Sequence, residues 1–77
     1  MDISYEQWRK SRCKGMIRSY LRGKRTSLNM VTAFLNPPNE APLSREVVVG
    51  LFRQTLLEVR NAIPERVAIL KKLLGIE

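Results

Sequence analysis

The chain has 77 residues, of which 44% are hydrophobic and 27% are charged, with one cysteine and no histidine. This length allows one small folded domain, which we expect to span residues 1–77 and whose core leaves roughly 3–5 kcal/mol of net stability. One cysteine excludes an internal disulfide, and the lack of histidine excludes the usual zinc sites. We therefore expect no metal or other cofactor. We also expect the small core to be supported by self-association or by a protein partner.

The positive charge is concentrated at the N-terminal end. The net charge is +7, and residues 1–25 carry eight basic and two acidic side chains, whereas residues 26–77 carry six and five. Such a one-ended excess is typical of proteins that bind a polyanion, such as nucleic acid or an anionic membrane surface.

The sequence predicts no membrane span and no secretory signal. The longest apolar runs, such as Val47–Val49, fall far short of the roughly 20 residues that a transmembrane helix needs. The lone cysteine agrees with a reducing compartment. We therefore expect an intracellular protein of the cytoplasm or of an organellar matrix.

The first predicted helix covers residues 5–22. Ser4 and Gln7 form an S-x-x-Q capping box, in which each side chain satisfies the other residue's backbone amide. Gly23 is placed to end the helix, because glycine tolerates the left-handed conformation that commonly follows the last turn.

A second, shorter helix is predicted over residues 28–35. Leu28, Val31 and Leu35 recur at the spacing of one helix face, directly after two hydroxyl residues. The segment 36–39 reads Asn-Pro-Pro-Asn and ends the helix, because proline lacks an amide proton and restricts the residue before it.

Two further helices follow, over residues 45–61 and 64–74. Ser44 is a suitable N-cap for the third helix. Pro64 suits the first position of the fourth helix, and Gly75 suits the position just after its end. The sequence therefore predicts an all-α fold, a small bundle of three or four helices joined by short loops.

One side of the first helix carries a basic stripe at one-turn spacing, which two further residues extend beyond the helix. The stripe comprises Lys14, Arg18, Arg22, Lys24 and Arg25. It is either a solvated helix face or a surface for nucleic acid or another acidic partner. No acidic residue follows Glu6 in this helix, so pairing between residues one turn apart cannot neutralise the stripe. We therefore treat it as the candidate binding surface.

The start of the first helix also carries unusual side chains. Trp8 stands among basic residues, where an aromatic ring can stack on an unpaired base, although its position suits packing against Ile3 or the core better. Arg9 and Arg12 fall on or beside the apolar side, which predicts either a frayed helix start or a carboxylate on a partner. Cys13 lies on the apolar side and is expected to be a buried structural thiol.

Nothing in the sequence indicates catalysis. The seven acidic residues form no closely spaced pair, and the four glycines are isolated, so there is neither an acid–base couple nor a phosphate-binding loop. We expect the protein not to be an enzyme. Three apolar residues lie off the main apolar stripes and would be exposed in a monomer, which predicts a protein-docking role. These residues are Leu57, Ile69 and Leu73.

Residues 48–60 read VVGLFRQTLLEVR and resemble the signature helix of LYR-motif mitochondrial proteins. Leu51, Phe52 and Arg53 correspond to the Leu-Tyr-Arg motif, with phenylalanine in place of the usual tyrosine. The motif also comes later in the chain than is usual for the family. The resemblance implies a small basic helical subunit or assembly factor of respiratory complexes or of the iron–sulfur machinery, often bound to an acyl carrier protein.

Two functional hypotheses follow from these patterns. The leading one is a non-enzymatic, small basic helical binding module that docks on a larger assembly, with its basic stripe contacting nucleic acid or another acidic surface. The alternative is a small helical subunit or assembly factor of a protein complex, in which the basic stripe meets an acidic protein.

Overall fold

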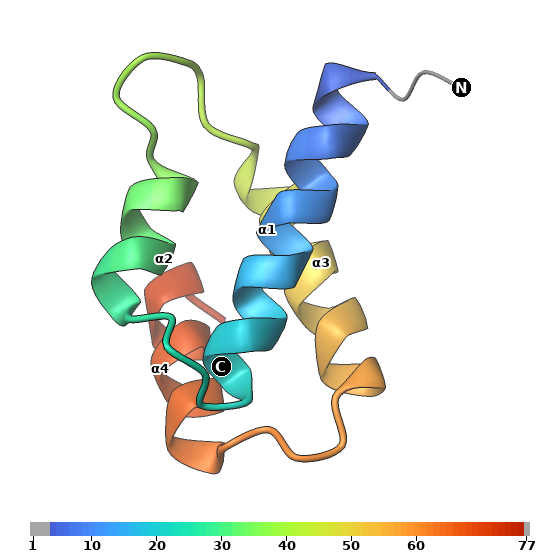
Figure 1. The fold of residues 1–77 in the computed structure, drawn as a ribbon, viewed down its shortest axis with the longest axis vertical. Coiled ribbons are helices and arrows are strands. Elements are labelled where there is room, and N and C mark those ends of the chain that lie inside the picture. Colours follow the sequence, from blue (N-terminus) through green and yellow to red (C-terminus); the bar gives the residue numbers. More distant parts are fainter. Residues whose placement is uncertain (1–3, 77) are drawn as a thin grey trace.

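Four α-helices make up the fold in the computed structural model, which describes residues 4–76 (Figure 1). They are α1 (Tyr5–Leu21), α2 (Leu28–Leu35), α3 (Arg45–Glu58) and α4 (Pro64–Leu74). The described residues contain no strand. The all-α prediction is confirmed, and α2 and α4 have the predicted bounds.

Serine side chains cap three of the four helices. Ser4, Ser27 and Ser44 each accept a hydrogen bond from the backbone amide three residues later, at 3.1–3.2 Å. These bonds satisfy amide groups that have no partner within the first turn. The capping box at the start of α1 is complete, because the Gln7 side chain also accepts a hydrogen bond from the Ser4 amide.

The third helix ends earlier than predicted, at Glu58 rather than at residue 61. Val59 already has an extended backbone, and the amide of Ile63 donates to the carbonyl of Leu21 at 2.8 Å. Pro64 favours the same outcome, because it excludes the helical conformation at the residue before it. The segment 59–63 therefore crosses to the end of α1 instead of extending α3.

Helix α1 is the centre of the core and contacts each of the other three helices. Figure 1 shows α2 and α3 on either side of α1, with α4 near its C-terminal end. The buried apolar residues form one cluster around α1. They are Cys13, Ile17, Tyr20, Leu21, Val31, Val48, Phe52, Leu70 and Leu74.

Glycine ends α1 and α4, as the sequence predicts. Gly23 and Gly75 have positive φ angles of 76° and 73°, which side chains other than hydrogen rarely tolerate. After α1 the amides of Gly23 and Lys24 donate to the carbonyls of Tyr20 and Ser19 at 3.1 and 3.0 Å, which is the Schellman arrangement.

Two arginines tie the ends of helices to their neighbours. Arg66 of α4 donates from Nη1 to the carbonyl of Tyr20, near the end of α1, at 3.0 Å. Arg45, the first residue of α3, donates from Nε to the carbonyl of Leu74, at the end of α4, at 2.9 Å. A guanidinium at a helix C-terminus pairs with unsatisfied carbonyls and with the negative end of the helix dipole. Among residues 4–76, no helix has the length and apolar character needed to cross a membrane.

Candidate functional site

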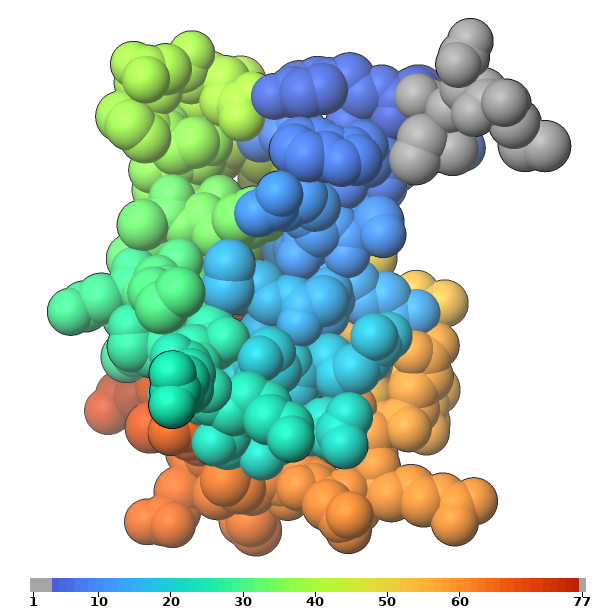
Figure 2. All heavy atoms as spheres, in the orientation of Figure 1, coloured from blue at the N-terminus to red at the C-terminus, as the bar shows by residue number. Residues whose placement is uncertain are grey.

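The five residues of the predicted basic stripe lie on α1 and on the turn after it. Lys14 and Arg18 are within α1, Arg22 is its C-cap, and Lys24 and Arg25 precede α2. The last three of these residues are exposed. Figure 2 shows α1 and the following turn, coloured blue to teal, at the surface directly above the orange segment that joins α3 to α4.

Glu58, the last residue of α3, binds the first part of the stripe. Its Oε2 lies 2.8 Å from Lys14 Nζ, and its Oε1 lies 3.5 Å from Arg18 Nη2. The stripe has no acidic partner one turn away within α1, as the sequence indicates, but this carboxylate from α3 pairs with two of its residues. Sequence spacing within one helix reveals only partners one turn apart, whereas Glu58 is brought in by the packing of α3 against α1.

The environment of Glu58 keeps its side chain charged. The hydrogen bond from Lys14, together with the positive charges of Lys14 and Arg18, holds the pKa of the Glu58 carboxyl below its usual value. Because this carboxyl is ionised at neutral pH, it offsets part of the positive potential of α1.

Arg60 adds a basic side chain that the helical pattern of the sequence does not indicate. It follows the end of α3 and lines a shallow surface hollow together with Arg18, Arg22, Glu58 and Asn61. The sequence predicts Arg60 within the third helix, but α3 ends at Glu58, and the segment that follows crosses to the end of α1 and brings Arg60 to this place. We define the basic surface as Lys14, Arg18, Arg22, Lys24, Arg25 and Arg60.

Trp8 lies at the surface, contrary to the expectation that it packs in the core. Its side chain is 44% exposed and stacks on Tyr5, with the ring centroids 5.8 Å apart. The Arg12 guanidinium lies over the Trp8 ring, 5.1 Å from its centroid. A base could stack on Trp8 only by displacing one of these neighbours. Ile3, the proposed partner of Trp8 in a staple, lies outside the described residues.

Arg9 and Arg12 contact groups within the chain, and the start of α1 is helical, which corrects the expectation of a frayed helix start. Arg9 donates from Nη2 to the carbonyl of Ala41 at 2.7 Å, and its Nε lies 3.8 Å from Glu40 Oε1. The Arg12 guanidinium also lies 5.8 Å from the centroid of the Phe34 ring. Through these contacts, the arginines at the start of α1 bind α2 and the loop after it.

The predicted docking residues Leu57, Ile69 and Leu73 are all exposed, as expected. Leu57 is 90% exposed, whereas Ile69 and Leu73 are 40% and 43% exposed. They do not form one patch around a common hollow. Leu57 lies near the end of α3, whereas Ile69 and Leu73 lie one turn apart on α4, where Leu73 borders a groove.

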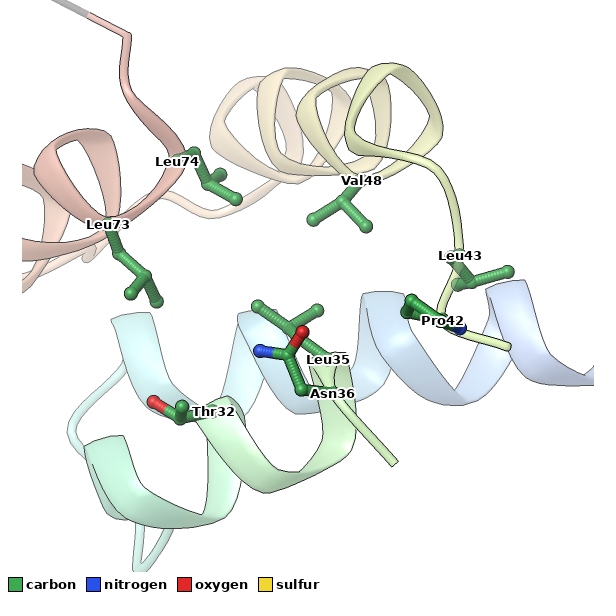
Figure 3. A pocket seen from close by; sticks show the side chains of 8 residues that line it. All are labelled: Thr32, Leu35, Asn36, Pro42, Leu43, Val48, Leu73 and Leu74. Carbon is green, nitrogen blue, oxygen red and sulfur yellow. The ribbon is translucent and has the colours of Figure 1, made fainter. Parts of the chain in front are cut away.

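This groove lies where α2, α3 and α4 meet (Figure 3). Leu73 and Leu74 of α4 approach it from one side, and Leu35 of α2 and Val48 of α3 approach it from the others. It exists because α2 and α4 pack mainly on α1 and leave a gap between themselves. Its lining consists of Thr32, Leu35, Asn36, Pro42, Leu43, Val48, Leu73 and Leu74.

Cys13 is fully buried, in agreement with the prediction of a structural thiol. Burial raises its pKa to about 11, and the nearby Arg9 charge only partly opposes this effect. A thiol with so high a pKa is a poor nucleophile at neutral pH. Within residues 4–76, no three His, Cys, Asp or Glu side chains are grouped so that they could hold a metal ion.

Comparison with known proteins gave no match to a family model, to a curated protein or to a solved structure. The resemblance to the LYR signature therefore stands on residues 48–60 alone. In this segment Phe52 is buried in the core and Arg53 is exposed, while Val59 and Arg60 lie beyond the end of α3.

Proposed function

We propose that the protein is a non-enzymatic nucleic-acid-binding module that uses the basic surface to contact backbone phosphates. The observation that carries the proposal is the composition of this surface. It gathers six basic side chains from α1, the turn after it and the α3–α4 connection, and Glu58 is the one carboxylate paired with it among the described residues.

The chemistry of these side chains suits phosphate. Four of the six are arginines, whose planar guanidinium groups can donate two parallel hydrogen bonds to one phosphate. Arg22, Lys24, Arg25 and Arg60 are exposed and make no ion pair with a described residue. Their charges therefore remain available for a polyanion.

Titration with a duplex and with a single strand of about 20 nucleotides tests this function, at roughly 50 and 200 mM salt, because phosphate binding weakens steeply with salt. Binding at the lower concentration that falls at the higher one is expected. No binding to either nucleic acid at low salt would overturn the proposal.

A triple variant locates the site. Replacing Lys14, Arg18 and Arg22 with glutamine should reduce the slope of log K against log salt by roughly two to three, because each phosphate that is no longer neutralised lowers the slope by about 0.7–0.9. The matched control replaces Arg53, Lys71 and Lys72 with glutamine, which removes the same charge outside the basic surface. Equal effects of both triple variants would show that only net charge matters and that the surface is not the site.

A second candidate function is a small subunit or assembly factor of a protein complex, and the exposure of Leu57 favours it. A leucine that is 90% exposed gains free energy when another surface covers it. In this case the basic surface would meet an acidic protein, and docking would support the small core. Two results together would favour this second function. The protein would bind no nucleic acid, and a native partner or a second copy of the chain would bind the wild type but not Leu57→Ser.

We infer an intracellular setting, in the cytoplasm or an organellar matrix, from the free, buried Cys13. Either candidate function is compatible with this setting.

A further inference from the structure

The Glu58 carboxylate lies within the basic surface rather than at its margin. It contacts Lys14 and Arg18, and it lines the same hollow as Arg22 and Arg60. One negative group is therefore placed where four positive side chains converge. A phosphate of a bound strand would bind at the same position, because phosphates and carboxylates bind ammonium and guanidinium groups through the same charge-assisted hydrogen bonds.

We propose that Glu58 occupies a phosphate-binding site of the basic surface in the free protein, and that a phosphate of the bound nucleic acid displaces it from Lys14 and Arg18. This inference rests on the proposed function and deepens it. It makes Glu58 an internal competitor that sets the affinity of the surface.

The position of Glu58 allows the exchange. Its side chain is 43% exposed, and it is the last residue of α3, directly before a segment with extended backbone. When it leaves Lys14 and Arg18, its carboxylate can turn to water, so no unpaired charge is left in the core. The C-terminus of a helix is also an unfavourable place for an acid, which offsets part of the stabilisation that the ion pairs of Glu58 provide.

Internal competition selects for ligands with several phosphates. Glu58 is attached to the same chain as Lys14 and Arg18, so its effective concentration at the site is high and a free phosphate ion competes poorly with it. A strand that already contacts Arg22, Lys24 and Arg25 brings its next phosphate to the site at a similarly high local concentration. The basic surface should therefore discriminate against single phosphates.

The test compares Glu58→Gln with Glu46→Gln. The two variants make the same change in net charge, but Glu46 lies about 18 Å from Glu58 along α3, given a rise of 1.5 Å per residue. With a single strand of about 20 nucleotides at roughly 50 mM salt, Glu58→Gln should bind about three- to sixfold more tightly than the wild type, the size expected for one charge about 4–6 Å from a phosphate across water. Glu46→Gln should bind within about twofold of the wild type, since its distance exceeds the Debye length.

Two further arms define the mechanism. Lys14→Gln should weaken binding more in the Glu58→Gln background than in the wild type, because Lys14 is fully available only when Glu58 is absent. Inorganic phosphate should compete with the strand more effectively on Glu58→Gln than on the wild type. Circular dichroism checks that each variant is folded, and Glu58→Ala provides a second variant with the same expectation.

The outcomes separate the two proposals. If the wild type binds but Glu58→Gln binds no more tightly than Glu46→Gln, or if the effects of Lys14→Gln and Glu58→Gln are additive, the displacement of Glu58 is overturned and the proposed function stands. If neither the wild type nor Glu58→Gln binds nucleic acid at low salt, the proposed function itself is overturned.

Discussion

The Arg66 side chain contacts both the backbone carbonyl and the ring of Tyr20. The Nη1 atom donates to the Tyr20 carbonyl at 3.0 Å, and the guanidinium carbon lies 4.6 Å from the ring centroid. The same Nη1 lies 3.3 Å from the carbonyl of Thr26, in the turn before α2. One side chain of α4 thus fixes both the end of α1 and the turn that follows it.

Replacing Arg66 with alanine should lower the free energy of unfolding by roughly 2–3 kcal/mol, because the substitution removes both the charge-assisted hydrogen bonds to backbone carbonyls and the cation–π interaction. Chemical denaturation measures this change. Arg53→Ala is the matched control, since Arg53 is exposed and makes no hydrogen bond or ion pair with a described residue. Similar decreases in both variants would mean that the Arg66 side chain contributes nothing specific.

Alanine at Gly23 and alanine at Gly15 should have opposite effects on stability. Gly23 has a φ of +76°, and a Cβ there would lie 2.7 Å from Ile63 Cδ1. Gly15 lies within α1, with no neighbouring atom within 4 Å of its added Cβ. We expect Gly23→Ala to destabilise by about 1–2 kcal/mol and Gly15→Ala to stabilise by roughly 0.5–1 kcal/mol. Thermal unfolding measures the two variants. Melting temperatures that both rise or both fall relative to the wild type would contradict this expectation.

Alkaline pH should destabilise the protein through Cys13. Burial raises the pKa of its thiol to about 11, from an ordinary value of about 9 in the unfolded chain. The free energy of unfolding is therefore undiminished by Cys13 below about pH 9. It falls as the pH rises towards 11, by roughly 2–3 kcal/mol in total.

Urea unfolding near pH 8 and near pH 10.5 tests this linkage, with Cys13→Ala as the reference. The wild type should lose up to about 2 kcal/mol more than the variant between these pH values. Equal losses would show that other groups cause the alkaline transition. A thiol reagent at neutral pH should label Cys13 only when the protein unfolds, because the side chain is inaccessible in the fold.

Trp8 provides an internal reporter of where a strand binds. It is the single tryptophan of the chain, and six residues of helix, about 9 Å along the axis, separate it from Lys14, the first residue of the basic surface. Binding at the basic surface should leave its fluorescence nearly unchanged. Strong quenching on addition of nucleic acid would move the binding site to the cluster of Tyr5, Trp8 and Arg12.

Most helix boundaries were predictable because their signals are local. The serine N-caps, Pro64 at the start of α4 and the glycines after α1 and α4 all act within a few residues of the boundary they define. The end of α3 was missed because its cause is distant. The amide of Ile63 donates a hydrogen bond to the carbonyl of Leu21, and no sequence pattern near residue 58 predicts that bond.

The candidate site was predictable only in part, for the same physical reason. Helical spacing placed Lys14, Arg18 and Arg22 on one side of α1. The ion pairs to Glu58 join residues 44 and 40 positions apart, so they depend on how α3 packs against α1. Likewise, the sequence indicated that Arg12 was out of place on an apolar side, but the rings that receive it came together only through the fold.

The central position of α1 has a consequence for the synthesis of the chain. The helix is made before any of its partners, yet its apolar side is covered only when α2, α3 and α4 have followed. Each of these three helices packs chiefly on α1, so we expect no pair of them to form a core without α1. Folding should therefore be a single cooperative event that requires all four helices. Fragments that lack α1 should not form a compact structure, and variation within this one helix is constrained by the core on one side and by the charged surface on the other.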